Sequence, residues 1–308
     1  TEISYFLGPT DIISEENFIY CENGWYDTKN NISQFNKNAF LQNEGKTLRG
    51  DSLYYERETG LGKAFQNVEL TDTAQNIVLK GNTARYLEKT EYAMLTDSAL
   101  MIYIDDEYDS LYVHADTLKS VPDTIPERKI IKAYYHVKFY REDLQGKSDS
   151  LVYSDEDSIF RFYRDPVIWS EENQLTSDYM EAHTKNKQIN RIEMIDNSFI
   201  ITQEDSVKFS QIKGRNMTGY IVNNELSRIE VDGNAETVYY GKDDQEIIGV
   251  NKAKSSKLSI LFKDNKVFKI VYRSSPSGKY YPLSIFPESE SKLEGFMWHE
   301  QYRPLEKR

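Results

Sequence analysis

A short pattern, in which a small residue and a polar residue precede an apolar strand, returns along the chain at nearly regular intervals. It starts at residues 50, 81, 115, 148, 177 and 214, so successive copies lie 31, 34, 33, 29 and 37 residues apart. A period of this length that drifts slightly is typical of a repeat architecture, in which each unit packs mainly against its neighbours. The copies read Gly50-Asp51-Ser52-Leu53, Gly81-Asn82-Thr83-Ala84, Ala115-Asp116-Thr117-Leu118, Ser148-Asp149-Ser150-Leu151, Ser177-Asp178-Tyr179-Met180 and Gly214-Arg215-Asn216-Met217.

Returning segments along the chain share a second frame. Their second and fourth residues are apolar, so both side chains point to the same side of a strand. The two frames together predict paired strands that stack unit upon unit. The returning segments are Asn38-Ala39-Phe40-Leu41, Asn67-Val68-Glu69-Leu70, Ser98-Ala99-Leu100-Met101, Pro166-Val167-Ile168-Trp169 and Ser198-Phe199-Ile200-Ile201.

The composition agrees with an all-β chain. Its 308 residues include 23 Tyr and 14 Phe, and disordered chains are poor in aromatic residues. Tyr, Thr and Val in short alternating runs favour strands. Turn-forming Asn, Asp and Gly residues recur roughly every 8–12 residues, which is the spacing expected of an all-β protein.

The sequence divides best at a proline-containing stretch, residues 122–128 (PDTIPER). We predict N-terminal repeat units over residues 1–121, a connecting loop over 122–128 and C-terminal repeat units over 129–287. Residues 288–308 are polar apart from Phe296-Met297-Trp298, and we expect a cap or a fraying end there.

The charge is uneven. The chain carries a formal net charge of −12, which makes nucleic acid a poor partner, because phosphate contacts need a broad basic surface. Residues 250–282 nevertheless hold eight basic side chains and one acid. Lysines on solvent faces and strand edges, where they discourage edge-to-edge pairing, would explain this segment. The alternative is a surface that faces phosphates or an acidic partner. The basic candidates are Lys252, Lys254, Lys257, Lys263, Lys266, Lys269, Arg273 and Lys279.

Cysteine content and terminal sequence bear on the compartment. Cys21 is the single cysteine of the sequence, so no intramolecular disulfide is possible. The chain has no apolar run near the roughly 18 residues of a membrane span. It shows no signal peptide at Thr1 and opens in what reads as the middle of a strand unit, so we expect a trimmed or mature form.

Motifs for chemistry are weak. Gly50-Asp51-Ser52-Leu53 spells the nucleophile block of a serine hydrolase family, which also needs an Asp-x-x-His base. No Asp stands three residues before any of the four histidines. The block recurs in copies whose serine drifts, so a tight corner explains it better than catalysis, and the Arg49-Gly50-Asp51 triplet belongs to the same corner. The histidines are scattered, so we predict no enzyme, no cofactor and no metal site.

The repeated unit resembles the OstA-like family. It has the form G-[DN]-x-Φ-x-Y followed by a return N-x-V-x-L, and residues 50–70 and 81–101 carry it most clearly. The family comprises periplasmic lipopolysaccharide-transport proteins of Gram-negative bacteria, including the LptA bridge and the N-terminal domain of LptD. Residues 5–10 and 21–27 look like the large OstA-like proteins of Bacteroidetes-type bacteria. The chain is longer than a simple bridge protein.

The resemblance implies an elongated β-jellyroll or β-taco of two facing antiparallel sheets in the periplasm. An apolar groove between the sheets would hold lipid A acyl chains on their way to the outer membrane. The other partners would be further OstA-like proteins, or copies of the same chain in a homo-oligomer, joined end to end by strand pairing. The implied groove residues are Ala39, Leu41, Leu53, Val68, Leu70, Ala84, Ala99, Met101, Leu118, Leu151, Val167, Trp169, Met180, Phe199, Ile201 and Met217.

Two alternatives remain open at this stage. Each groove position also fits an ordinary sandwich core. With a filled core the chain would be a cell-envelope scaffold or a module that binds glycan or protein, and an exposed aromatic row on one outer face would favour that function. A hydrolase that depends on Ser52 is a distant third, because its base is missing.

Overall fold

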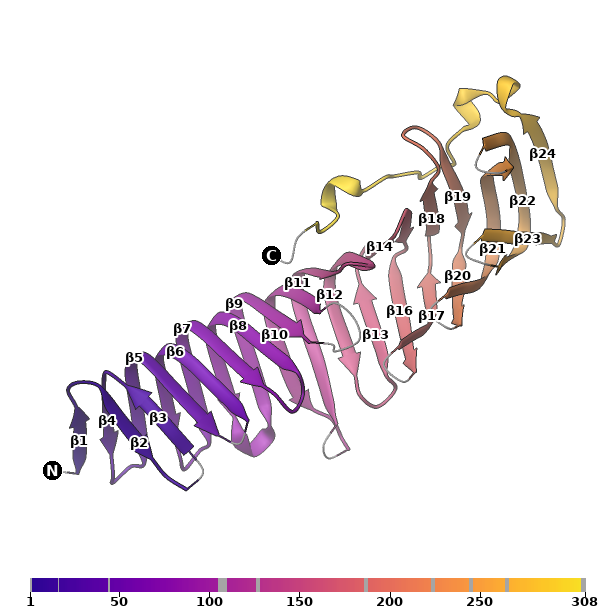
Figure 1. Ribbon diagram of the computed structural model, residues 1–308. Coiled ribbons are helices and arrows are strands. Elements are labelled where there is room, and N and C mark those ends of the chain that lie inside the picture. The colour runs from indigo at the N-terminus through magenta and orange to yellow at the C-terminus, as the bar shows by residue number, and fades with distance from the viewer. Residues whose placement is uncertain are drawn as a thin grey trace. The chain divides into compact units, whose positions relative to one another are not determined.

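The computed structural model describes residues 2–15, 17–43, 45–104, 110–125, 128–185, 188–222, 225–243, 246–263 and 266–305. The chain is all-β, with 73% of it in strands and 4% helical. The strand pairings within the described residues are antiparallel (Figure 1). The predicted fold class is confirmed at this level. Within the described residues, no helix is long and apolar enough to cross a membrane.

The chain divides into two compact units. Thr1–Glu142 and Ser150–Glu156 belong to the first unit, and Asp143–Asp149 and Asp157–Leu305 belong to the second. The predicted connecting segment 122–128 falls within the first unit, and its residues 126–127 lie outside the described residues.

The first unit begins with short strands and continues with long ones. From β5 to β11 each strand pairs with the next along the chain, so sequence neighbours lie side by side (Figure 1). A single 3₁₀ turn, η1 (Glu88–Thr90), is described in this unit. The strands are β1 (Ile3–Phe6), β2 (Thr10–Ile13), β3 (Asn17–Cys21), β4 (Asn23–Asp27), β5 (Ile32–Asn43), β6 (Lys46–Glu56), β7 (Leu61–Asp72), β8 (Ile77–Leu87), β9 (Tyr92–Tyr103), β10 (Leu111–Pro122), β11 (Lys129–Arg141) and the second half of β12 (Leu144–Ser154).

Each long strand turns a corner near its middle, where the pairing register shifts. On alternate strands the corner is a pair of residues with positive φ, such as Lys37 and Asn38 (57° and 55°). A glycine lies near the corner on β6 and β8, and Ala115 takes this place on β10. A Cβ added to Gly81 would lie 2.8 Å from Leu95 Cδ1, so two strand halves approach closely there.

The repeated sequence block is therefore a corner. Its serine is held by other polar side chains: Ser52 Oγ donates a hydrogen bond to Asn36 Oδ1 at 2.8 Å and accepts one from Gln34 Nε2 at 3.2 Å. The same corner carries a second contact, from Asn67 Nδ2 to the Asp51 carboxylate at 3.1 Å. These contacts give Ser52 and Asp51 a structural role.

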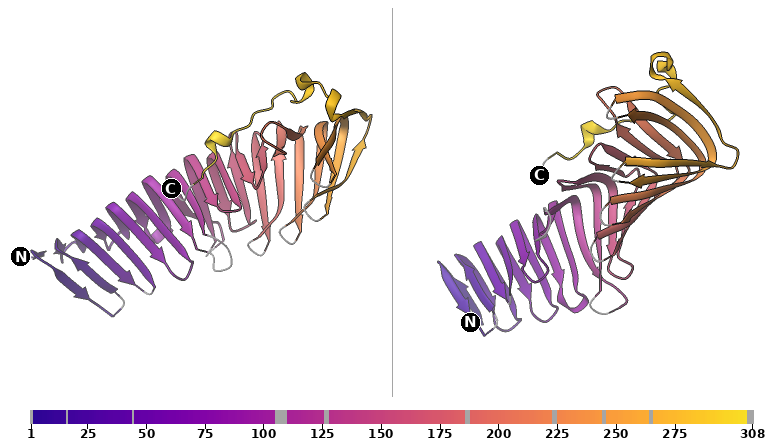
Figure 2. Two further views of the ribbon diagram at one scale, coloured as in Figure 1. Left: turned by 45° about the horizontal axis from the view of Figure 1, so that its top comes forward. Right: turned by 45° about the vertical axis from the view of Figure 1, so that its right-hand side comes forward.

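The corners split the long strands of the first unit into two ladders, A and B. Figure 2 shows the two layers from two directions. Ladder A contains residues 32–36, 52–56, 61–65, 83–87, 92–96, 117–122 and 129–134, and ladder B contains residues 39–43, 46–49, 68–72, 77–80, 99–103, 111–114 and 137–141.

The second unit also has two ladders, C and D, but most of its strands stop at the corner instead of bending through it. Two strands, β21 (Glu225–Asp243) and β22 (Glu246–Lys263), run through both ladders. Ladder C contains β13 (Ile159–Tyr163), β16 (Tyr179–Lys185), β17 (Gln188–Ile195), β20 (Asn216–Val222), the first part of β21, the second part of β22 and β23 (Lys266–Arg273). Ladder D contains the first part of β12, β14 (Val167–Ser170), β15 (Asn173–Thr176), β18 (Ser198–Gln203), β19 (Phe209–Gly214), the other parts of β21 and β22, and β24 (Ser277–Pro282).

The C-terminal segment runs back from β24 over ladder D of the second unit (Figure 1). Residues 286–303, called the strap here, follow the 3₁₀ turn η2 (Leu283–Ile285). The strap contains two further 3₁₀ turns, η3 (Glu288–Glu290) and η4 (Glu300–Tyr302). All of its residues are described and none belongs to a strand.

Candidate functional site

An apolar row crosses five successive strands of ladder B. Leu41 pairs with Leu48, Leu48 with Leu70, Leu70 with Leu79, and Leu79 with Met101. All five side chains are half-buried. Directly opposite partners in adjacent strands have Cβ atoms about 5 Å apart, so the row forms one continuous apolar strip.

The strip becomes more exposed with distance from the corner. Val68 and Ala99, next to the corner, are 3% and 0% exposed, whereas Leu70 and Met101, two residues further along the same strands, are half-buried. Residues two apart share one face of a strand. The ladders are therefore packed together at the corner, and the apolar face of ladder B is partly accessible beyond it.

Ladder A supplies tyrosines on its corresponding face. Tyr55 and Tyr86 lie two residues beyond Leu53 and Ala84 on their strands and are 36% and 44% exposed. Tyr55 Oη donates a hydrogen bond to Glu88 Oε2 at 2.7 Å. Burial, together with Glu88, raises the pKa of Tyr55 to about 12. The apolar strip of ladder B is therefore accompanied, on ladder A, by aromatic groups with polar tips.

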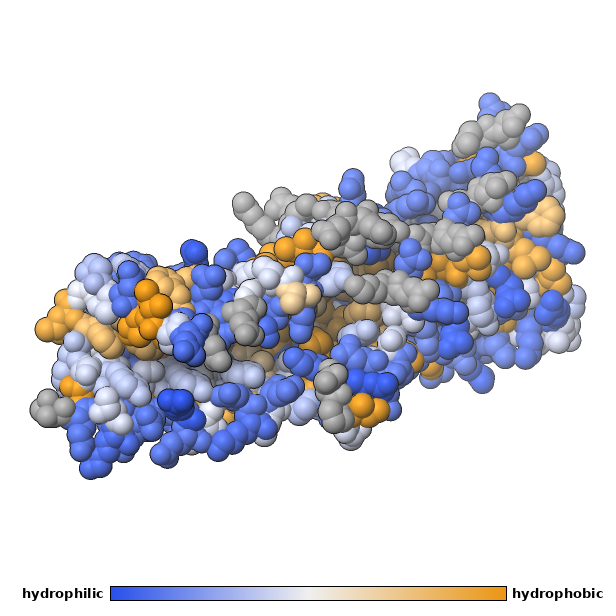
Figure 3. All heavy atoms as spheres, turned by 60° about the horizontal axis from the view of Figure 1, so that its bottom comes forward, coloured by the Kyte–Doolittle hydropathy of each residue, from blue (hydrophilic) through white to orange (hydrophobic). Residues whose placement is uncertain are grey.

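The opposite face of these strands combines charged side chains with apolar ones such as Val78 and Leu100. Lys80 and Glu69, which neighbour Leu79 and Leu70 in sequence, form an ion pair at 2.9 Å. On ladder A, Lys63 Nζ lies 5.2 Å from the centre of the Tyr54 ring. Figure 3, which shows one side of the molecule, has mostly hydrophilic surface with smaller apolar patches. In ladder B the uninterrupted apolar row from Leu41 to Met101 thus lies on the inner face.

The structure brings nine of the sixteen predicted groove residues together on the inner face of the first unit. Leu53 and Leu118 are 5% and 6% exposed, and Ala84 is half-buried. Leu151, on the part of β12 that belongs to the first unit, is buried as well. The residues that share the inner face are Ala39, Leu41, Leu53, Val68, Leu70, Ala84, Ala99, Met101 and Leu118.

In the second unit the inner row of ladder C is a filled core. Met180 pairs with Phe162 and with Met194, and Met194 pairs with Met217. The row continues through Val231 to Leu258. These six side chains are between 0% and 5% exposed. The predicted groove positions Met180 and Met217 therefore lie in a packed interior.

Four other predicted groove residues lie on the outer face of ladder D. The inner face is identified by Ser198, whose Oγ lies 2.9 Å from the Met194 carbonyl oxygen in ladder C. Ile200 shares that face, so Phe199 and Ile201 point the other way. The same alternation places Val167 and Trp169 opposite to Ile168. These four residues do not join the inner face with Met180.

The reason is a shift of one residue after the corner. In the first unit the residue that follows the positive-φ pair points inward, as Ala39 and Val68 do. In the second unit Ser198 takes this inward position after Asp196 and Asn197 (φ 54° and 50°), so Phe199 is one place later. A shift of one residue moves a whole strand's side chains to the other face. The common frame therefore holds in the first unit and fails in the second.

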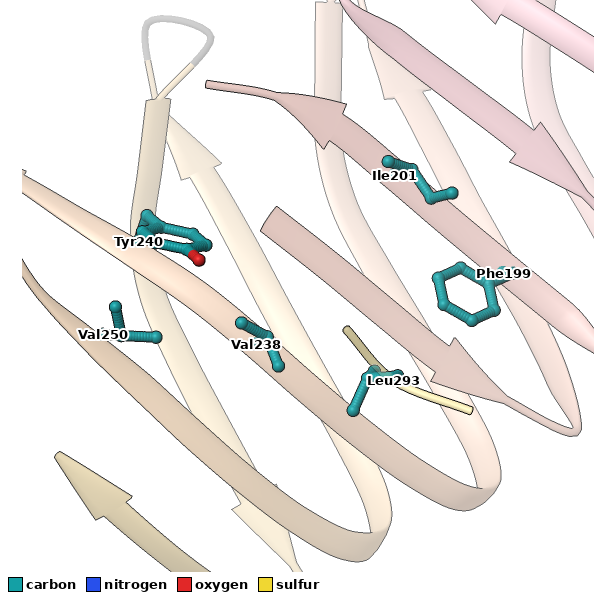
Figure 4. Close-up of a cluster of buried hydrophobic side chains, with 6 residues drawn as sticks. All are labelled: Phe199, Ile201, Val238, Tyr240, Val250 and Leu293. Atoms are coloured by element: carbon teal, nitrogen blue, oxygen red, sulfur yellow. The ribbon is translucent and has the colours of Figure 1, made fainter. Parts of the chain in front are cut away.

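The strap covers this outer face. Phe199 and Ile201 form a buried cluster with Val238, Tyr240, Val250 and, from the strap, Leu293 (Figure 4). Buried and exposed residues do not alternate at the start of β18, because Ser198 to Ile201 are all buried. That run is the sequence signal that ladder D needs cover on two sides.

The basic segment does not form one patch. Lys252 and Lys254 lie in the ladder D part of β22, where Lys252 Nζ is 3.3 Å from Glu290 Oε2 of the strap. Lys257 lies in the ladder C part and pairs with Asp232 at 3.0 Å. The remaining basic candidates are at the β22–β23 turn, on β23 and on β24, namely Lys263, Lys266, Lys269, Arg273 and Lys279.

Within the described residues, a group that sequence reasoning missed has the donor types of a metal site. Glu181 and Glu193 face each other across β16 and β17, and His183 Nε2 lies 3.2 Å from Glu181 and 3.7 Å from Glu193. Arg161 and Arg191 pair with the two carboxylates at 3.6 and 3.0 Å, so the group is already neutralised as an ion-pair network. A Glu-x-His alternation opposite a Glu is the signal for it.

Neither the scan against protein-family models nor the search of curated proteins finds a match to this chain.

Proposed function

We propose that the first unit binds the acyl chains of a lipid along the apolar strip of ladder B. The continuous, half-buried row from Leu41 to Met101 is the observation that carries this proposal. A folded unit gains stability by burying such side chains, and a contiguous apolar strip left partly exposed is typical of a binding surface. The proposed function is binding.

The strip suits an acyl chain in size and energy. Its five strands, about 4.8 Å apart, extend over about 19 Å. Burial of acyl chains gains about 0.8 kcal/mol per CH₂, so about a dozen buried methylenes contribute roughly 10 kcal/mol before the cost of ordering. Tyr55 and Tyr86 and the charged outer face leave polar surroundings for a sugar or phosphate headgroup.

The repeat and its corner support a more specific function. We propose an OstA-like β-taco in the periplasm, where it carries lipopolysaccharide by its lipid A chains as part of a bridge to the outer membrane. Strand addition at free ladder edges would join it to other OstA-like proteins or to further copies. Within the described residues β24 pairs with β22 alone, so it offers one such edge.

A second candidate function rests on the outer face of ladder C. Tyr163 and Tyr179 lie there with ring centres 5.1 Å apart, and the Arg228 guanidinium lies 4.3 Å from the centre of the Tyr220 ring. Aromatic rings beside carboxylates are suited to a glycan. With the filled core of the second unit, this face favours an envelope module that binds sugar.

A matched pair of variants in β8 tests the lipid proposal. Leu79 and Val78 are adjacent, aliphatic and half-buried, but they point to opposite faces. Leu79→Asp places a charge in the strip and should weaken displacement of a fluorescent fatty-acyl probe by lipopolysaccharide at least tenfold. Val78→Asp should leave it within twofold. Equal lipid binding by both folded variants would contradict the proposal. Glycan binding that depends on the aromatic residues of ladder C would instead favour the second candidate.

A further inference from the structure

Glutamine side chains of ladder D hold the strap by hydrogen bonds to its backbone. Gln211 Nε2 donates to the Ser291 carbonyl at 2.7 Å, and Gln211 Oε1 accepts from the Leu293 amide at 2.8 Å. Gln174 repeats this geometry, with 2.8 Å to the Met297 carbonyl and 2.6 Å from the His299 amide. In both cases one amide group binds a carbonyl and the N–H two residues later.

The glutamines are spaced regularly in ladder D. Gln145 pairs with Trp169, Trp169 with Gln174, Gln174 with Ile201, and Ile201 with Gln211, so a glutamine occurs on every second strand. Gln145 Oε1 accepts from Arg303 Nε at 2.8 Å. The three glutamines therefore meet the strap at positions six residues apart, near residues 291, 297 and 303.

Buried amides without partners are costly, and here the strap is their partner. Gln174 and Gln211 are 0% and 1% exposed. A buried polar group that loses its hydrogen bonds costs about 1–3 kcal/mol. The glutamine side chains of ladder D are thus arranged to bind an extended backbone that lies across them. Their regular spacing is not needed for pairing between the strands.

Apolar contacts between the glutamines add side-chain selectivity. Leu293 enters the cluster of Phe199 and Val238. Phe296 and Trp298 both pack on Phe209, with ring centres 5.3 Å away in each case. The strap therefore reads as a ligand of the form Leu-x-x-Phe-x-Trp, recognised by its backbone and by three apolar side chains.

We propose that the outer face of ladder D is a peptide-recognition surface, and that the strap of a second copy of this chain binds it in the same way as the chain's own strap. The strap makes no strand pairing and is joined to β24 through η2, whose Leu283 and Ile285 are 37% and 66% exposed. Contacts in cis and in trans are identical, so only the effective concentration of the tethered strap favours cis.

The test cuts the tether in the folded chain. A site for a specific protease replaces residues 283–285, the chain is cleaved, and a fluorescein-labelled peptide of residues 286–305 is added. Anisotropy should rise to saturation as the labelled peptide replaces the cut strap. The uncut chain should bind the peptide at least tenfold more weakly, because its own strap competes.

Two variants define the site. Gln174→Leu in the cut chain should weaken the peptide at least tenfold, whereas Gln42→Leu, an exposed glutamine of the first unit, should leave its affinity unchanged. Three results would overturn the proposal: a cut strap that never exchanges with the labelled peptide, equal binding by the Gln174→Leu chain, or precipitation of the cut chain before exchange. The last would show that the strap is part of the core.

Discussion

The two units use the same corner but fill the space behind it differently. In the first unit exposure rises from Val68 to Leu70, and the inner row of ladder B stays half-open. At the same distance from the corner in ladder C of the second unit, Ala182, Ile229 and Ile260 are 2%, 3% and 2% exposed, and Ile192 is half-buried. A repeat therefore fixes where strands turn, and the side chains placed beyond the turn decide how completely the interior is filled.

The outer faces of ladders B and D differ as well, and here the second unit has the face with the buried apolar cluster. Ladder B has charged residues there, with Glu69 and Lys80 in an ion pair. Ladder D has Phe199, Ile201 and Val238, which the strap covers. Burying the inner face of one unit thus coincides with a second apolar face that needs its own cover. The comparison teaches that the half-open apolar face and the face covered by the strap belong to different units.

Core truncation should show the largest difference between the units. Leu258→Ala in the filled row of ladder C should lower the free energy of unfolding by about 3–5 kcal/mol, because it leaves a cavity. Leu70→Ala in the half-open row should lower it by about 1 kcal/mol, since less area is lost. Urea denaturation followed by circular dichroism measures both. Equal losses would mean that ladder B is packed as tightly as ladder C.

Truncation of the strap's anchor should have an intermediate and local effect. Leu293 is 6% exposed, and Leu293→Ala should weaken strap docking by about 2–3 kcal/mol. Hydrogen exchange at the amides of Leu293 and His299, which donate to Gln211 and Gln174, should accelerate, while amides of ladder B keep their rates. Acceleration in both units would show that the strap supports more than ladder D.

The corners should respond alike in both units. Asn67 and Asn197 have φ of 52° and 50°, and each donates to an aspartate, Asp51 or Asp178, at 3.1 Å. Alanine tolerates the left-handed region less well than asparagine. Asn67→Ala and Asn197→Ala should each cost about 1 kcal/mol in urea denaturation. A difference above about 1 kcal/mol would break the claim that the corner is common to both units.

The smallest effect concerns tyrosine ionisation on ladder A. The Tyr55 pKa is raised to about 12 by burial and by Glu88. Because the pKa of Tyr55 in the folded protein lies above the usual 10.0, its contribution to the stability of the folded protein is fully present below pH 10. This contribution is lost as pH rises through about 12. In NMR spectra of Cζ-labelled tyrosine, the resonance absent from Tyr55→Phe should titrate near 12. Titration near 10 would place Tyr55 in free solvent.

Much of the fold follows from the sequence, because the corner is local chemistry. The small residue at Gly50 or Gly81 and the polar residue after it mark each turn, and aromatic, alternating strands between them predict an all-β chain. The face to which each side chain points after the corner is harder to predict. Ser198 takes the inward position that Ala39 takes in the first unit, and no local feature of the returning segment announces that shift.

The strap could not be predicted from local pattern. Its polar residues suggested a cap or a fraying end. Its position is instead fixed by hydrogen bonds to Gln211 and Gln174, which lie 82 and 125 residues away in sequence from the amides that they bind. Contacts at such separation leave no periodicity in either segment. The continuous apolar run at Phe199 to Ile201 was the available sign that ladder D is covered on both faces.

Photo-crosslinking to lipopolysaccharide tests the difference between the units most directly. A photoreactive residue is placed in turn at Leu70 and Met101 of the first unit, at Met194 and Phe199 of the second, and at Glu58, which is exposed in a turn. The account predicts lipid adducts at Leu70 and Met101 and at none of the other three. Silence at Leu70 and Met101 in folded protein, or equal labelling at Met194 and Phe199, would contradict it.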